Sequence, residues 1–207
     1  MYEGETIKFL NTEEREALFR TIENDTSRHH IRNKAIFLLA EYAAQRVSEV
    51  GLLKVSDFNR YTREVYFRRL KGSRNNTLRI LDDTVYTALI DYLDYRKENG
   101  IDSECLFPSQ KGTPISRQRL NEIIKHYCDL TGIAPDKAHF HTLKHTRAVT
   151  LAEIGLDTKE VQFWLGHKRI QNTEIYLQFT SKQQDILYQK FIALTNEQAE
   201  RKIYQHE

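Results

Sequence analysis

The chain has 207 residues, which suits one large domain or two small ones and is enough to bury a core. Its 40% apolar and 29% charged content is ordinary for a soluble globular protein, and it has no apolar run long enough for a membrane span. The N-terminus lacks the basic and apolar stretches of a secretory signal. The only cysteines, Cys105 and Cys128, make no disulfide framework, which fits a reducing cytoplasm.

Charge is distributed unevenly along the chain, although its formal net value is only +2. Residues 1–26 carry seven acidic against three basic side chains, whereas residues 60–80 carry seven basic side chains against one acid, Glu64. A local basic patch on a nearly neutral protein is typical of a surface that contacts a phosphate backbone. A solvated strand face would show the same composition, so charge alone leaves both interpretations open.

The first third of the chain reads as helical. Asn11 followed by Glu14 predicts a capped helix start, and this helix should run to about Glu23. A longer helix is expected at roughly 28–45, with apolar residues on most of its faces, which predicts a central position in the fold. A short helix at Val47–Leu53 should follow.

Residues 63–81 change character, because two strand-like runs flank a turn rich in Gly, Ser and Asn. This pattern predicts a β-hairpin, and Leu106-Phe107 could form another short strand. The remaining start and stop signals predict helices at about 83–100, between Ser116 and Gly132, at 143–154, at 158–165 and around Tyr176, with an amphipathic helix from Ser181. The whole therefore predicts a mainly α single domain with a small antiparallel β-hairpin.

The last third of the chain places basic groups and a tyrosine in close order. His141, Lys144 and His145 stand at the start of a predicted helix, where basic side chains and free amides favour an anion. His167 follows a predicted helix end, and Tyr176 comes nine residues later. Cleavage of DNA through a covalent intermediate needs a nucleophile, cations around the non-bridging oxygens and a general acid, and these side chains could supply them without a metal.

Each of these residues also has a purely structural interpretation. Tyr176 is one of 11 tyrosines and could be a packing aromatic, and His167 could be a cation favoured by a helix C-terminus. Arg46 could simply pair with Glu49 three positions later. A zinc site is not expected, because the histidines and the two cysteines do not have the spacing of a ligand set.

The joint pattern resembles the signature of the tyrosine recombinases, the phage integrase family. That signature is a His-x-Leu-Arg-His-Thr box, a Leu-Gly-His box and then the nucleophilic tyrosine. Here the three parts read His141–Thr146, Leu165–His167 and Tyr176. Upstream, residues 45–53 resemble the box that carries the first catalytic arginine, and Lys71 matches the lysine of the hairpin.

The resemblance covers about residues 10–195 and implies the mainly helical catalytic-domain fold, double-stranded DNA as the partner, no cofactor, and self-association of two to four protomers on DNA. The implied catalytic set is Arg46, Lys71, His141, Lys144, His167 and Tyr176. In this set Tyr176 attacks the phosphodiester and forms a 3′-phosphotyrosyl link, His141 assists proton transfer from the tyrosine, and Lys71 protonates the leaving 5′-oxygen. The remaining three hold the non-bridging oxygens.

Two further groups follow from the same resemblance and from the charge pattern. Glu49 and His145 are expected to support the site. Basic side chains of the hairpin and of the helices near the boxes are expected to bind DNA, namely Arg68, Arg69, Arg74, Arg147, Lys168 and Arg169.

One position departs from the family pattern, because Lys144 stands where arginine is usual. Arginine grips two phosphate oxygens through its planar fork, whereas lysine supplies a single charge and can lose its proton. Arg147, one turn further on, could compensate. Three functions are therefore open: a site-specific recombinase, a type IB topoisomerase-like enzyme that shares the chemistry, or a DNA-binding regulator on the same scaffold with impaired catalysis.

The expected organisation is a catalytic domain at 1–180 and a helical tail at 181–207. Leu187, Phe191 and Leu194 form one apolar stripe on this tail, which should dock on a neighbouring protomer. Most family members carry an N-terminal helical domain that completes a clamp around DNA. This chain starts at the catalytic domain, so it resembles the short, single-domain members typified by the fimbrial-switch invertases, or it is an excised domain of a longer protein.

Overall fold

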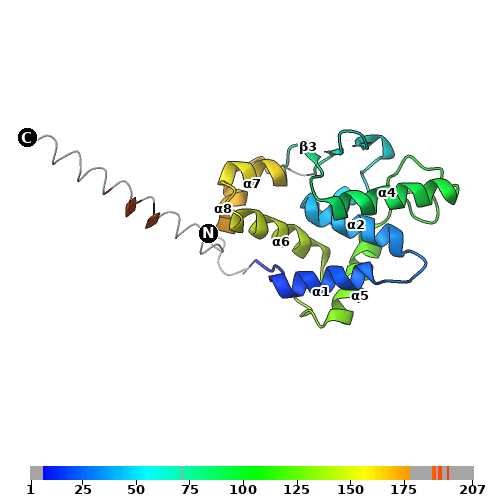
Figure 1. Cartoon of the computed structure of the whole chain (residues 1–207), viewed down its shortest axis with the longest axis horizontal. Coiled ribbons are helices and arrows are strands. Elements are labelled where there is room, and N and C mark those ends of the chain that lie inside the picture. Colours follow the sequence, from blue (N-terminus) through cyan, green and yellow to red (C-terminus); the bar gives the residue numbers. More distant parts are fainter. Residues whose placement is uncertain (1–6, 71, 178–187, 190, 193–194, 196–207) are drawn as a thin grey trace, which may run out of the picture.

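The computed structural model describes residues 7–70, 72–177, 188–189, 191–192 and 195 (Figure 1). Its elements in chain order are α1 (Thr12–Glu23), α2 (His30–Tyr42), α3 (Val47–Val50), a 3₁₀ turn (Val55–Asp57), β1 (Phe58–Asn59), β2 (Glu64–Phe67), β3 (Asn76–Arg79), α4 (Asp83–Glu98), α5 (Arg117–Thr131), α6 (Phe140–Glu153), α7 (Thr158–Leu165) and α8 (Gln171–Leu177). The predicted class, mainly α with a small antiparallel sheet, is confirmed. Lys71 and most of the predicted tail lie outside the described residues.

Helix starts follow the capping signals of the sequence. The Asn11 side chain accepts a hydrogen bond from the Glu14 amide at 2.8 Å, and the Glu14 carboxylate accepts one from the Asn11 amide at 2.9 Å. Asp157 and Glu160 make the same reciprocal pair at the start of α7. These bonds satisfy amides that have no partner inside the helix, which is why the boundaries could be predicted.

The long apolar helix predicted at roughly 28–45 is α2, and it lies at the centre of the hydrophobic core. Ile36, Phe37 and Leu39 are fully buried, and the helix packs on both α4 and α6. The Phe37 ring contacts the rings of Tyr127 and Phe140, with centroids 5.9 and 5.8 Å apart. Burial of each such side chain contributes about 1.5–3 kcal/mol to folding.

The predicted hairpin is present as β2 and β3, which pair in antiparallel register with Val65 opposite Leu78. A third strand, β1, adds to the edge in the order β1-β2-β3. This strand has only two residues, too few for a strand pattern in the sequence. Leu106-Phe107 does not form the predicted strand, because each of these residues makes a single backbone bond, to Leu53 and Ile115 respectively.

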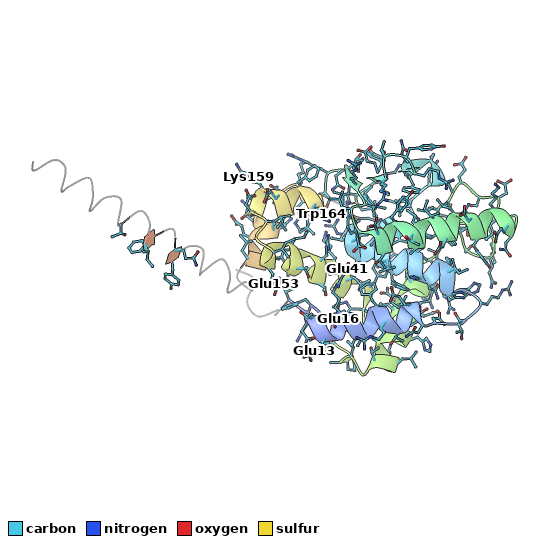
Figure 2. All side chains as sticks on the ribbon, viewed as in Figure 1. Glu13, Glu16, Glu41, Glu153, Lys159 and Trp164 are labelled. Carbon is cyan, nitrogen blue, oxygen red and sulfur yellow. The ribbon has the colours of Figure 1, made fainter. Side chains whose placement is uncertain are left out.

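α6 lies between α1 and the pair α7 and α8, which close one end of the domain, while α4 lies toward the other end (Figure 1). Trp164 lies on the side of α7 that faces the other elements, whereas Lys159 is at its outer side (Figure 2). The Trp164 indole donates to the Tyr42 carbonyl at 2.7 Å, which joins α7 to the end of α2. Among the described residues, no helix is both long and apolar enough to cross a membrane.

The turn of the hairpin is held against the end of α7. The Arg74 amide donates to the Gly166 carbonyl at 2.8 Å, and Ser73 pairs with His167 as an isolated β-bridge. Gly166 has a positive φ of 64°, and a Cβ there would lie 2.7 Å from the Arg74 carbonyl oxygen. Only glycine therefore allows the two backbones to approach this closely.

Gly166→Ala should therefore lower the free energy of unfolding more than Gly132→Ala does. Both glycines have φ near 65–70°, but nothing lies within 4 Å of a Cβ at Gly132. The left-handed backbone costs about 1–2 kcal/mol at either position, and the clash at Gly166 should add about 1–3 kcal/mol. Urea unfolding of the two variants measures the difference, and equal losses would show that the hairpin can move away from α7.

Candidate active site

The Glu49 carboxylate lies fully buried between two arginines. Arg46 donates to one of its oxygens at 2.8 Å, and Arg69 donates to the other at 3.2 Å. The Leu70 amide adds a third bond at 3.1 Å. Burial acts to raise the pKa of Glu49, but the Arg69 charge and the hydrogen bonds outweigh it and hold the pKa below its usual value. The Arg46–Glu49 pair considered from the sequence is present, and Glu49 also binds the hairpin.

Arg69 is a correction to the sequence analysis, which assigned it to DNA. Its side chain is 0% exposed. Its guanidinium donates to the Ala43 carbonyl at 2.8 Å and to the Asn76 side chain at 3.0 Å, besides Glu49. Because these buried acceptors occupy it, Arg69 is a structural cation that connects the hairpin to the end of α2, and it is not available to a phosphate in this structure.

Arg147 also differs from the expected DNA contact. Its guanidinium contacts the rings of both Tyr42 and Trp164, 4.9 Å from each centroid, and these two rings also pack on each other with centroids 5.3 Å apart. Its Nε is buried and has no hydrogen-bond partner among the described residues. Cation–π contacts of this kind stabilise a packed position. In this structure the charge of Arg147 therefore faces aromatic rings, and whether it compensates for Lys144 stays a prediction.

The other basic residues assigned to DNA lie at the surface. Arg74, Lys168 and Arg169 are exposed in the turns beside the cluster. Arg68 is half-buried, pairs with Asp57 and lies 5.3 Å above the Tyr66 ring. Their positions leave them accessible to a polyanion.

Lys144 is buried in the second turn of α6, with an exposed fraction of 2%. Its Nζ has no hydrogen-bond partner among the described residues. Burial, followed by the repulsion from Arg46, lowers the pKa of Lys144 to about 7, although the Glu49 charge opposes this shift. A buried ammonium without a partner is costly, so this position favours a bound anion.

His145, not His141, lies at the tyrosine hydroxyl. Its Nδ1 is 2.9 Å from the Tyr176 Oη, which can donate its proton to the neutral ring. His141 is more exposed than His145, and its ring packs edge-on against the His145 ring with centroids 4.3 Å apart. Burial, and then neighbouring positive charges, lower the pKa of His145 to about 3 and that of His141 to about 4, so both rings are neutral near pH 7.

His167 is the second histidine against the tyrosine. Its ring stacks on Tyr176 with centroids 6.4 Å apart, and its Nδ1 is 3.0 Å from the Thr173 hydroxyl. Burial and then the charges of Lys144 and Arg46 lower its pKa to about 3. Its backbone pairs with Ser73, whose hydroxyl accepts a bond from Arg46 at 2.8 Å, so the hairpin links the arginine to the histidine.

Tyr176 lies in α8 with an exposed fraction of 2%. Burial raises its pKa to about 12, and the Arg46 charge opposes the rise. The phenol is therefore protonated at neutral pH and needs a base to become a nucleophile. The predicted catalytic and supporting residues that the structure describes thus lie together, where α3, the hairpin, α6 and α8 meet. They are Arg46, Glu49, His141, Lys144, His145, His167 and Tyr176.

Sequence reasoning missed Ser73 and Thr173, which orient Arg46 and His167 by hydrogen bonds. Both stand close to predicted site residues, but a serine or threonine has no spacing signal of its own. No group of three or more His, Cys, Asp or Glu side chains suited to a metal ion occurs in the described part of the chain.

The unpartnered Lys144 ammonium should make stability depend on pH. Between a folded pKa of about 7 and its ordinary value near 10.4, the unfolded chain binds a proton at this side chain that the folded chain does not. Stability should therefore rise with pH across this window, by about 1.4 kcal/mol per pH unit. Relative to Lys144→Met, the wild-type chain should gain stability from about pH 7 to about pH 10.

Urea unfolding across this range measures the effect, with the exposed Lys159→Met as the matched control for loss of one lysine. A constant difference between wild type and Lys144→Met at every pH would contradict a lowered pKa.

Comparisons with known proteins identify the family of the chain. The model of the phage integrase family matches residues 8–183. The chain is 34% identical over 169 residues to the type 1 fimbriae regulatory protein FimB of Escherichia coli K12, covering 81% of this chain and 82% of FimB. It is 30% identical to the tyrosine recombinase XerD of Proteus mirabilis over 77% of this chain, but spans only 51% of XerD.

Solved structures show the same fold. The crystal structure of XerA recombinase superposes with a TM-score of 0.75 at 26% identity, covering 91% of this chain and 66% of XerA. The post-cleavage complex of XerH with its palindromic difH substrate gives 0.76 at 22% identity, covering 89% of this chain and 53% of XerH, and this likeness concerns the fold alone. Since the family model spans most of the sequence and FimB is 34% identical over most of both chains, the chain belongs to the phage integrase family, the tyrosine-type site-specific recombinases.

Proposed function

We propose that the chain cleaves and rejoins DNA strands at specific sites through a 3′-phosphotyrosyl link to Tyr176. The observation that carries this proposal is the position of the Tyr176 hydroxyl, which is bonded to the His145 ring and stacked on His167. The charges of Arg46 and Lys144 lie close enough to shift the pKa values of these side chains. A nucleophile, a base and cations for the phosphate thus occur together.

In the proposed reaction the Tyr176 oxygen attacks phosphorus while its proton passes to a histidine. The bond from phosphorus to the 5′-oxygen breaks, and Lys71, which lies outside the described residues, protonates that oxygen. Arg46, Lys144 and His167 stabilise the charge that develops on the non-bridging oxygens. The phosphotyrosyl bond conserves the energy of the broken bond, so rejoining needs no nucleotide.

The geometry supports His145 as the first proton acceptor, although the sequence analysis assigned this step to His141. His145 already holds the hydroxyl in the resting structure. A scissile phosphate between the cations would raise the pKa of both histidines, because opposite charge favours the protonated ring. His141, stacked on His145 at the rim, is then placed to accept a proton in turn.

Family membership supports the recombinase over a topoisomerase-like enzyme. A regulator that only binds DNA is supported by Lys144 in the arginine position and by the name of the relative FimB. A suicide substrate with a nick near the cleavage site separates these functions, since a covalent adduct forms only with an active nucleophile.

We further propose that residues 1–180 form the catalytic domain, and that it works as a dimer or tetramer on cytoplasmic DNA. Arg68, Arg74, Lys168 and Arg169 would contact the phosphate backbone. In the tail, Leu187 and Leu194 lie outside the described residues, while the Phe191 side chain is 67% exposed. Docking of the tail on a neighbouring protomer would bury this surface.

Tyr176→Phe should abolish covalent attachment to the suicide substrate and leave DNA affinity nearly unchanged. The change removes the attacking oxygen but keeps the ring that packs between His145 and His167. Tyr61→Phe is the matched control, because that tyrosine is 92% exposed and should retain full activity. Adduct formation by the Tyr176 variant at the wild-type rate would refute the assignment.

Lys144→Ala should slow cleavage strongly, because it removes a cation from the phosphate site. Lys144→Arg tests whether the pocket is built for lysine. The buried, tightly packed position predicts that the larger guanidinium misfits and that cleavage falls by about tenfold, or roughly 1.4 kcal/mol. Single-turnover cleavage of a nicked substrate by the three proteins measures both effects. An alanine variant as fast as wild type would place Lys144 outside the reaction.

A further inference from the structure

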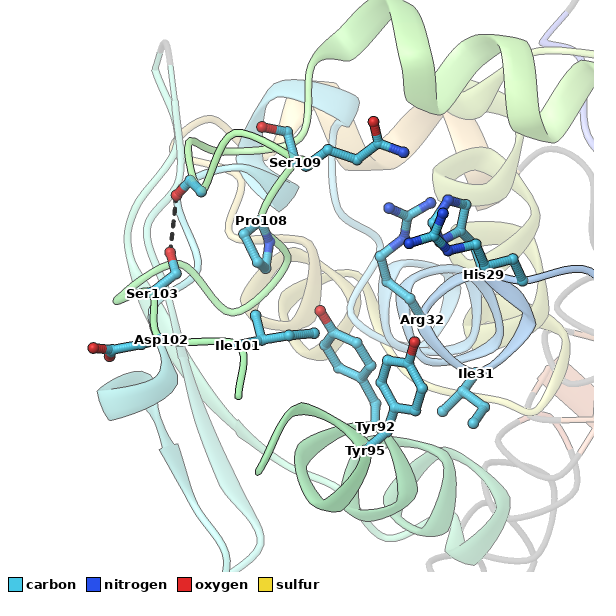
Figure 3. A pocket seen from close by; sticks show the side chains of 13 residues that line it. His29, Ile31, Arg32, Tyr92, Tyr95, Ile101, Asp102, Ser103, Pro108 and Ser109 are labelled. Carbon is cyan, nitrogen blue, oxygen red and sulfur yellow. Dashed lines mark hydrogen bonds between the residues drawn. The ribbon is translucent and has the colours of Figure 1, made fainter. Parts of the chain in front are cut away.

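A cavity of about 550 Å³ lies away from the tyrosine, between the start of α2, the end of α4 and the loop at 101–112 (Figure 3). Its lining includes Arg28, His29, Arg32, Tyr92 and Tyr95. The catalytic cluster lies at the other end of α2, whose 13 residues separate the two places by about 20 Å. The cavity is therefore not part of the proposed cleavage site.

The cavity is lined by more positive than negative charge. Neither Arg28 nor Arg32 forms an ion pair with any described residue. The charges of Arg28, Arg32 and Arg119 act, after burial, to lower the pKa of His29. Asp102 is the one carboxylate among the lining residues, and it points away from the arginine in Figure 3. No carboxylate among the lining residues therefore neutralises Arg28 and Arg32.

The backbone at the start of α2 adds to the positive charge of the cavity. α2 begins with no acidic side chain in its first turn, and its N-cap, His29, makes no capping hydrogen bond. α5 and α6 also begin without an acidic residue, but the N-cap of α5, Ser116, accepts a hydrogen bond from the Arg119 amide. The amino end of a helix carries partial positive charge, so arginines beside it are unfavourable unless an anion lies among them.

Arg32 places a fixed guanidinium group inside the cavity. Its Nε is buried and has no hydrogen-bond partner among the described residues, and one of its terminal nitrogens donates to Asn33 at 3.1 Å. Asn33 in turn bonds the Tyr127 hydroxyl, which fixes the position of the group. The hydroxyls of Tyr92 and Tyr95 lie toward Arg32 in Figure 3. An oriented guanidinium with a free nitrogen and nearby hydroxyls suits an oxyanion.

We propose that this cavity binds a phosphate group of an organic ligand, with Arg32 as the inner contact and Arg28 and His29 at the rim. The volume falls in the range of small-molecule sites and exceeds what a bare phosphate ion fills, and the half-buried Tyr95 ring offers a surface for an attached organic group. The phosphate belongs either to a DNA strand that runs past the domain or to a free nucleotide. Neither source requires the chemistry of Tyr176.

The test uses the full chain and the variants Arg32→Gln and Arg28→Gln, with Arg20→Gln as the matched control on the exposed surface of α1. Binding of AMP and of inorganic phosphate is followed by calorimetry at constant ionic strength. Affinity for a short DNA duplex is measured over a series of salt concentrations. Because Arg28 is exposed, its variant keeps the test valid even if Arg32→Gln fails to fold.

A free nucleotide as the source predicts that AMP binds the wild-type chain, and that both cavity variants bind it about tenfold more weakly while Arg20→Gln does not. A DNA phosphate as the source predicts no AMP binding, weaker duplex binding in both cavity variants, and a salt slope reduced by about one. If the cavity variants match Arg20→Gln with every probe, the cavity holds no phosphate and the proposal is overturned. Loss of adduct formation by Tyr176→Phe is independent of all three results.

Discussion

The buried Glu49 carboxylate is the interaction on which the site depends. It joins two segments that are distant in sequence, because Arg46 and Glu49 belong to the start of α3 and its N-cap, whereas Arg69 belongs to the hairpin. Arg69 then reaches the Trp164 carbonyl at the end of α7. Breaking a buried pair by loss of one partner typically costs about 3–5 kcal/mol, since it leaves an uncompensated charge. The same carboxylate therefore orients Arg46, the arginine proposed to bind the phosphate, and holds the scaffold together.

The site holds more cationic side chains than the single carboxylate of Glu49 can balance. Lys144 has no hydrogen-bond partner among the described residues, and the pKa values of three histidines are lowered, first by burial and then by neighbouring cations. The histidines are neutral at rest, so one of them can accept the tyrosine proton. In the reaction proposed above, a phosphodiester would supply negative charge beside these cations and raise the pKa of the histidine rings, which would make proton transfer to them easier.

Local signals predicted much of the fold, and long-range contacts account for what they missed. The capping pairs at Asn11 and Asp157 and the apolar alternation of the hairpin strands each depend on residues a few positions apart, so the sequence shows them directly. Arg68 and Arg69 look equivalent in sequence, but only Arg69 meets Glu49 and α7. His141 and His145 are one helical turn apart, and only the position of α8 decides which of them reaches Tyr176. The site residues could be predicted as a set, whereas their individual contacts could not.

The contact of Arg147 with the Trp164 ring determines what the fluorescence of the chain reports. Trp164 is the chain's one tryptophan, and it lies under this cation while its indole is bonded to the end of α2. Its own carbonyl accepts from Arg69 and from Asn76 of the hairpin. Tryptophan fluorescence, excited at wavelengths that the 11 tyrosines do not absorb, therefore comes from the junction of α2, α7 and the hairpin, and it reports whether these parts stay together when DNA is bound.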